Sequence, residues 1–561
     1  MIGLGSRRLA ALVLIVSLGA CKKEGGAGDT ADLPAEMKPH PAQGDPSKLA
    51  MPAVMAHVPA DTPYLLAGLD TIPPEFYAKL QQMLAPMADF VGDQWRTQRS
   101  DSKLLASVLS ELDGKWNQAG LESLGFSVQP RFALYGLGLA PMVIRMAVKD
   151  HKVVQATIER IAARAGEELP AMVSKDGHNY WQHTSDDGTS FVIALADNQA
   201  IFAIGKAAAV DAKLGLILGI DKPTHSMADG AQVKQLMARH GFGGQLIGFA
   251  DTRQIASKAL EAAGAAPSPA CSAEIDRLSA KLPRLVFGYG ELSPTKISGG
   301  MVVELSPDAV AALRSLKVEI SGLATALSGH PLFVMAGGVD LAKAQQLGVA
   351  IAGNLKQLGA ACDLGPLVDG ADRAAHSLGE PLPDPVGQIA GVTLVLNDLV
   401  LGARRQDGIP EKVDGFVAIA SPDARGLFNK ASAMEPQVKG LGVVADGKLH
   451  PVSLPMALPF AVSAGIGDRA LVMTTGDKSR PAAEKLLGAR GGGKAPLFAM
   501  SYDFGKLMEL MMQSEEMRRS GATNPGFVVF FDKLKNLFGY LSGSIDVTEH
   551  GLAMWSTIEL H

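Results

Sequence analysis

The sequence predicts an α+β fold made of two tandem, similar modules. Matching stretches recur in both halves, turn residues separate short apolar runs, and amphipathic helices follow several of those runs. Consecutive hairpins indicate an antiparallel meander sheet, and helices packed on one face complete the α+β arrangement. We place the modules at residues 59–318 and 319–561.

The strongest of these observations is the repetition of five stretches in the same order. The matching pairs are Pro63–Asp70 with Pro331–Asp340, Met142–Ile158 with Gly415–Ala431, Phe191–Gly219 with Phe460–Gly488, Gln245–Asp251 with Pro496–Asp503, and Lys296–Leu305 with Gly551–Leu560. Each single match is weak, but their collinearity favours duplication of one module. Two unrelated α+β halves are the alternative. We expect an extra helical region near Asp101–Leu124 in the first module.

Local signals support the individual elements. Asp187-Gly188 lies between the stretches NYWQHT and SFVIAL, which is typical of a tight hairpin turn. Val154 and Ile158 follow Asp150 at helical spacing and predict an amphipathic helix there. The sequence therefore predicts strands that end at aspartates and lead into helices.

The first residues have the order of an export signal. Arg7 and Arg8 precede the apolar run Leu9–Leu18, and Gly19-Ala20 precedes Cys21. This order of positive, apolar and small residues resembles a bacterial lipoprotein signal, which implies a signal peptide at residues 1–20 and lipidation of Cys21. An ordinary secretory signal and an uncleaved anchor helix are the alternatives.

Residues 21–58 are predicted to form the lipidated cysteine and a disordered tether. This stretch is rich in Gly, Ala, Pro, Asp and Lys and has no helical or strand period. Lys22, rather than an aspartate, follows the cysteine. In lipoproteins that the signal resembles, this favours the outer membrane, with the protein facing the periplasm. The membrane, reached through lipid on Cys21, is then the first expected partner.

Composition excludes some partners. The formal net charge is −5, and removal of residues 1–20, which carry two arginines and no acid, changes it to −5 − 2 = −7. An acidic chain makes nucleic acid an unfavourable partner.

Two cysteines follow Cys21, namely Cys271 and Cys362. In an oxidising compartment they predict one disulfide across the junction of the modules, which would stabilise the fold by about 4 kcal/mol in the chain-entropy model. Two buried, reduced thiols are the alternative.

The sequence offers little catalytic chemistry. Gly488–Lys494 (GARGGGK) copies part of a phosphate-binding loop, but Ala495 replaces the hydroxyl residue and the run follows a predicted helix instead of a strand. His178 and His183 flank Trp181 five positions apart, so they point to opposite faces of a strand. We expect no catalytic, cofactor-binding or metal-ligating residues. A methionine-rich helix is interpreted as core packing, with an adaptable apolar surface as the alternative, and contains Met508, Met511, Met512 and Met517.

Several stretches also resemble a known family. They are Pro59–Asp70 (PADTPYLLAGLD), Arg131–Asp150, NYWQHT, Gly248–Arg253 (GFADTR) and Pro283–Leu292 (PRLVFGYGEL). Over most of the predicted mature chain the sequence resembles an uncharacterised family of bacterial envelope lipoproteins. The resemblance implies an envelope location and supplies no catalytic residue.

Three functions are therefore compatible with the sequence. The first is a non-catalytic envelope lipoprotein that binds a protein partner or maintains the envelope. The second is a carrier or receptor for an apolar or amphiphilic ligand held between the two modules. The third is a hydrolase with a dispersed active site.

Overall fold

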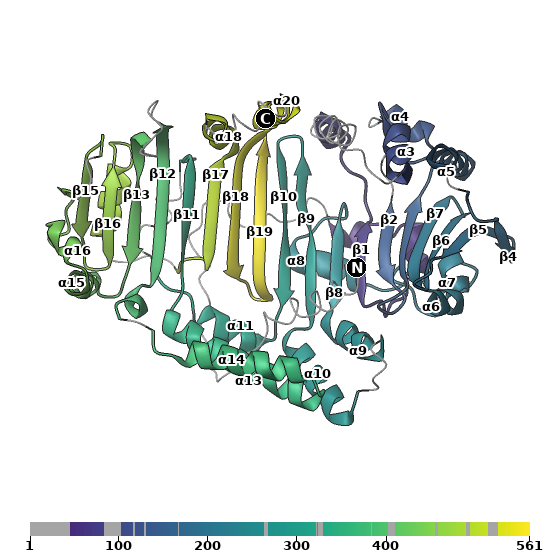
Figure 1. Ribbon diagram of the computed structural model, residues 1–561, viewed down its shortest axis with the longest axis horizontal. Coiled ribbons are helices and arrows are strands. Elements are labelled where there is room, and N and C mark those ends of the chain that lie inside the picture. The colour runs from purple at the N-terminus through teal and green to yellow at the C-terminus, as the bar shows by residue number, and fades with distance from the viewer. Residues whose placement is uncertain are drawn as a thin grey trace.

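The computed structural model describes residues 45–82, 103–115, 118–127, 129, 131–166, 168–262, 267–320, 323, 329–382, 384–401, 410–454, 458–489, 494–513 and 525–561. Within these residues, 19 strands form one continuous antiparallel sheet flanked by helices (Figure 1). The predicted α+β class is confirmed.

Strands of the first half occupy one side of the sheet. From the outer edge to the centre they are β4 (Val173–Lys175), β5 (His178–Thr184), β6 (Thr189–Ala196), β7 (Gln199–Lys206), β3 (Met142–Ala147), β2 (Phe132–Gly136), β1 (Tyr64–Gly68), β8 (Ile247–Asp251), β9 (Arg284–Ser293) and β10 (Lys296–Glu304). Asp187 and Gly188 form the predicted turn between β5 and β6.

Strands of the second half continue the sheet from the centre to the other edge. They are β19 (Gly551–Leu560), β18 (Phe538–Val547), β17 (Phe498–Asp503), β11 (Phe333–Gly338), β12 (Gly391–Leu401), β13 (Pro410–Ala420), β16 (Ala470–Thr475), β15 (Val462–Ile466) and β14 (His450–Pro451). From outside to centre, β15-β16-β13-β12-β11-β17-β18-β19 runs in the same pattern as β6-β7-β3-β2-β1-β8-β9-β10. The five matching stretches fall at equivalent places in these two series.

The two halves meet at a strand pair. Strand β10 pairs with β19 along its whole length, and Gly300 lies opposite Trp555 at the middle of the ladder. Main-chain hydrogen bonds therefore join the two halves, and their junction is part of the sheet.

Aspartates at strand ends start helices in both halves. The Asp150 carboxylate accepts from Lys152 N at 2.9 Å at the start of α5 (His151–Ala165), and Asp423 accepts from Gly426 N at 2.8 Å at the start of α15 (Ala424–Met434). Asp251 and Asp503 likewise accept from main-chain amides at 3.0 and 2.9 Å. A side-chain oxygen at this position satisfies an otherwise unpaired helix N–H, which explains the predicted change from strand to helix.

Helices lie at both ends of the strands (Figure 1). At one end are α3 (Lys103–Leu112), α4 (Gln118–Ser123), α5, α18 (Phe504–Gln513) and α20 (Pro525–Lys535). At the other are α9 (Thr252–Ala262), α10 (Pro269–Lys281), α11 (Pro307–Arg314), α13 (Leu341–Ala361) and α14 (Gly365–Gly379), with α15 and α16 (Pro436–Gly440) at the far end of the molecule. The helical region predicted near Asp101–Leu124 is present as α3 and α4. It is not an extra feature of the first half, because the second half also has helices at the equivalent place. Helices α13 and α14 follow β11 in the second half as α3 and α4 follow β1 in the first.

One face of the sheet, here called the covered face, carries the main cores. In the first half, α6 (Ala207–Ala212), α7 (Leu214–Leu218) and α8 (Gln232–His240) contribute to a core over β1, β2, β3 and β7. In the second half, α17 (Arg480–Gly488) packs over β13 and β16. The short η4 (Val386–Gln388) precedes β12.

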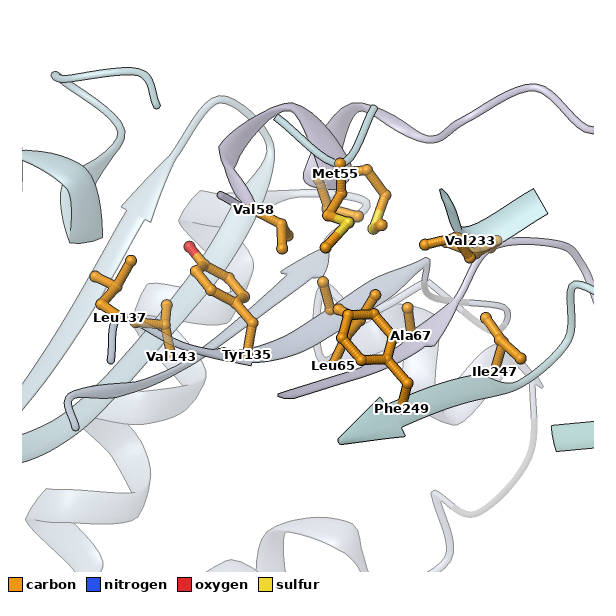
Figure 2. Close-up of a cluster of buried hydrophobic side chains, with 14 of the residues drawn as sticks. Met55, Val58, Leu65, Ala67, Tyr135, Leu137, Val143, Val233, Ile247 and Phe249 are labelled. Atoms are coloured by element: carbon orange, nitrogen blue, oxygen red, sulfur yellow. The ribbon is translucent and has the colours of Figure 1, made fainter. Parts of the chain in front are cut away.

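The end of the predicted tether is folded. Residues 45–58, expected to be disordered, form η2 (Pro46–Lys48) and η3 (Ala53–His57). Met55 and Val58 are fully buried against Leu65 and Tyr135 of β1 and β2 (Figure 2). Burying such side chains stabilises a fold by about 1.5–3 kcal/mol each, which explains why this aperiodic stretch packs on the covered face. The described chain therefore starts its fold before residue 59.

Within the described residues, we find no helix that combines the length and the apolar character needed to cross a bilayer.

Candidate ligand-binding surface

The second face of the sheet, here called the open face, is apolar. Along β1, β2 and β3, side chains alternate between buried positions on the covered face and half-buried positions on the open face. An antiparallel sheet with one solvated face normally places polar residues on that face. Here the half-buried positions hold residues such as Leu66, Leu134 and Ile144.

Residues that pair directly across antiparallel strands share a face, so the registers define continuous rows. The first row crosses ten strands without a polar side chain and consists of Phe202, Ile144, Leu134, Leu66, Gly248, Phe287, Met301, Met554, Ile545 and Phe498. The second row extends it through the second half and consists of Met500, Met335, Leu394, Val417 and Met473. Together these rows define the open face.

The size of this surface follows from strand spacing. The rows cross 14 strands from β7 to β16. At about 4.8 Å between neighbours this corresponds to about 60 Å along the sheet. The hydrocarbon core of a bilayer is about 30 Å thick. The open face is therefore long enough to hold extended acyl chains.

Parts of this surface are accessible to solvent. Phe191, Val392 and Met473 lie on it and expose 43%, 38% and 42% of their surface. An extended apolar surface of this kind marks a ligand, membrane or protein contact in soluble proteins.

Helices wall the open face at both strand ends near the centre. At one end Phe76, from the helix at residues 74–82, packs with Leu292 of β9 and Ile297 of β10. At the other end Val310 of α11 packs with Val303 of β10 and neighbouring side chains. The middle of β9, β10 and β19 lies between these two contacts.

A buried ion cluster is the nearest arrangement to acid–base chemistry. The Glu304 carboxylate accepts from His240 Nε2 at 2.8 Å and from Arg239 Nη1 at 3.1 Å. Burial acts to raise the pKa of Glu304, but the His240 hydrogen bond and the Arg284 and Arg239 charges outweigh it and lower the pKa. Among the described residues, no hydroxyl or thiol is hydrogen-bonded to His240. The cluster thus has an acid and a base without an adjacent nucleophile, and it ties α8 to the end of β10.

The sequence-predicted residues are distributed as follows. Cys21 lies outside the described residues. Cys271 and Cys362 form a disulfide, with a Cα–Cα distance of 4.6 Å, and it connects α10 of the first half with the end of α13 of the second. Next to the disulfide, Ser268 Oγ donates a hydrogen bond to Ala361 O.

The remaining motifs stay apart from one another. Gly488 ends α17, and Lys494 forms an isolated main-chain β-bridge with Glu319. The three glycines at 491–493 lie outside the described residues. His178 and His183 lie on β5, where Trp181 is buried. No group of three or more His, Cys, Asp or Glu residues within the described ranges could hold a metal ion.

The methionine-rich stretch is partly described. Met508 on α18 is buried, as expected for core packing, and Met511 is 41% exposed. Met512 is half-buried, and Met517 falls outside the described residues.

Comparison with known proteins provides no relative: no protein-family model, no curated protein and no solved structure matches this chain.

The open face could have been found from sequence. The run FVMAGG in β11 is apolar at successive positions, which indicates that both faces of this strand are apolar. The rows themselves depend on strand order and register, which no local pattern contains.

Proposed function

We propose that this protein is a non-catalytic, lipid-anchored component of the bacterial cell envelope that binds the apolar part of an amphiphilic ligand on its open face. The observation that carries the proposal is the continuous apolar row from Phe202 to Phe498. Transfer of acyl chains from water onto such a surface is favourable by about 25 cal/mol per Å². Helices at both strand ends suit an elongated ligand better than a flat protein surface.

The anchoring part of the proposal comes from the sequence. Arg7 and Arg8, the apolar run and Cys21 have the order of a lipoprotein signal, and Lys22 favours the outer membrane. Residues 21–44 would then link the lipid to the folded body. The resemblance to uncharacterised envelope lipoproteins agrees with this location.

We also infer that the two halves arose by duplication of one module. The support is their common strand order and the helix-capping aspartates at equivalent strand ends. Duplication would explain how a sheet of this length arose, because pairing β10 with β19 joins two apolar faces into one.

Anchoring is tested by replacing Cys21 with alanine. The variant should incorporate no labelled palmitate and should accumulate as a longer precursor. Lipidation of the variant at the wild-type level would contradict this part of the proposal.

Ligand binding is tested on the purified full chain with a fluorescent long-chain fatty acid and by mass spectrometry of co-purified lipids. Met473→Lys and Met301→Lys place a charge on the open face, whereas Met434→Lys is the matched control because Met434 is 66% exposed on α15 outside the rows. Loss of one methionine contact costs about 1.5 kcal/mol or more, so affinity should fall roughly tenfold. Equal affinity in all three variants, or a co-purified protein in place of lipid, would refute lipid binding.

A further inference from the structure

A cavity of about 280 Å³ lies in the second half, on the covered face and therefore opposite the open face. Ala418 and Ala420 of β13 and Ala470 of β16 form its floor, and Leu486 of α17 lies on its wall. For comparison, a dry apolar cavity of about 150 Å³ holds a benzene molecule. The space is therefore about twice that needed for one benzene ring.

The first half has long side chains at the corresponding positions. By strand order and register, Ala418 of β13 corresponds to Arg145 of β3. Ala418 lies opposite the core residue Val472 of β16, and Arg145 lies opposite the core residue Ile201 of β7. By the same register Ala470 corresponds to Gln199. The Arg145 and Gln199 side chains are buried and hydrogen-bonded at 3.1 Å. Two alanines thus leave space in one half where an arginine and a glutamine fill it in the other.

A hydroxyl group in the cavity wall has no hydrogen-bond partner among the described residues. Thr393 of β12 lines the cavity beside Ala418 and is 1% exposed, and its Oγ1 makes no hydrogen bond with any described residue. In the first half, the position that corresponds to Thr393 is held by Ala133 of β2, opposite Arg145. A buried hydroxyl without a partner is unfavourable, so a ligand that hydrogen-bonds to Thr393 would gain affinity by relieving it.

The mouth of the cavity is polar. Arg469 and Glu319 line it and form an ion pair with a 3.4 Å distance between Nη1 and Oε2, and each side chain is about half exposed. A ligand could enter past this pair without breaking the core. The cavity therefore combines an apolar interior, one internal hydrogen-bonding group and an accessible entrance, which are the general features of a small-molecule site.

We propose that this cavity binds a small, mainly apolar molecule that carries one hydroxyl group, of the size of a two-ring aromatic alcohol. The apolar rings lie over the alanine floor, and the ligand hydroxyl pairs with Thr393 Oγ1. This site is independent of the open face, because the two surfaces belong to opposite faces of the same strands.

The test compares two probes that differ by one hydroxyl, 1-naphthol and naphthalene, in equilibrium dialysis against the full chain. Wild type should bind 1-naphthol more tightly. Thr393→Val keeps the side-chain shape and should weaken 1-naphthol binding about fivefold without weakening naphthalene binding. Ala418→Leu fills the cavity and should abolish binding of both probes.

Met473→Lys is the matched control, because Met473 lies on the open face of β16, two strands from Thr393. It should leave 1-naphthol binding unchanged. The proposal is wrong if neither probe binds, if Thr393→Val and Ala418→Leu both bind 1-naphthol as wild type does, or if Met473→Lys weakens that binding. The last result would place the probe on the open face and support the proposed function alone.

Discussion

Replacing Arg145 with methionine should destabilise the first half by about 3 kcal/mol. Arg145 is 1% exposed and all its hydrogen bonds are internal. Its Nε donates to Tyr135 Oη at 3.2 Å, and Nη1 donates to Gln199 Oε1 at 3.1 Å. Its Nη2 donates to Leu216 O at 3.1 Å and to Ile217 O at 2.6 Å, at the end of α7.

The magnitude follows from the acceptors that lose their donor. Methionine keeps most of the apolar stem but donates no hydrogen bond. Leu216 O also accepts from Gly219 N at 3.3 Å, whereas Ile217 O, Gln199 Oε1 and Tyr135 Oη are left without a described partner. Each buried, unpaired acceptor costs about 1–3 kcal/mol. Relief from burying the guanidinium charge offsets part of that sum, which leaves about 3 kcal/mol.

The assay is urea unfolding of the full chain, followed by hydrogen–deuterium exchange in β3 and α7. Ala418→Met is the matched control, because it adds the same side chain at the corresponding position of the second half, where it meets a cavity. It should leave the unfolding midpoint unchanged or raise it. If Arg145→Met retains the wild-type midpoint, or if both variants shift it equally, the assignment of Arg145 as the residue that fills this position is refuted.

Three further predictions concern other parts of the fold. Burial, and secondarily the Arg145 charge, lower the pKa of His57 from its usual 6.5 to about 4; its contribution to stability is therefore complete above pH 6.5 and declines as pH falls toward 4. The stability advantage of wild type over His57→Gln should shrink by about 2 kcal/mol across that window, allowing for solvent screening, and a constant difference in pH-dependent urea unfolding would contradict it. Cys271 and Cys362 are 91 positions apart in the sequence, and replacing both with serine should lower the free energy of unfolding by about 4 kcal/mol in the chain-entropy model. Urea unfolding measures this loss, and an unchanged midpoint would contradict it. Gly300→Ala should lower stability by about 1–3 kcal/mol because its Cβ would clash with the main-chain oxygen of Met554; an unchanged melting temperature would show that the β10–β19 ladder can shift to accept it.

Local chemistry made much of the fold predictable. The aspartates at 150, 251, 423 and 503 follow apolar strands, and each caps a helix in the structure. The turn at Asp187-Gly188 and the pairing of Cys271 with Cys362 could also be predicted, because a turn residue and a lone cysteine pair leave few alternatives.

The contribution of residues 45–58 was not predictable in the same way. The buried residues of this stretch are Val54, Met55 and Val58, which lie in or directly after the short 3-10 helix η3. Their spacing matches neither a helical nor a strand period. Their burial depends on side chains of β1 and β2, such as Leu65 and Tyr135, that only the assembled sheet brings together (Figure 2).

The candidate sites depend on differences between the halves that a search for similarity overlooks. The matching stretches identified what β3 and β13 share, whereas the cavity arises where they differ, at Arg145 and Ala418. Similarity of strand order specifies the position of each side chain, and the volume and polarity of that side chain decide whether the position is filled or open. The open face shows the converse, because both halves keep apolar residues at positions such as Leu66 and Met335, which belong to none of the buried clusters of the described residues. A surface that remains apolar without contributing to a core needs another cause, and binding of an apolar ligand supplies one.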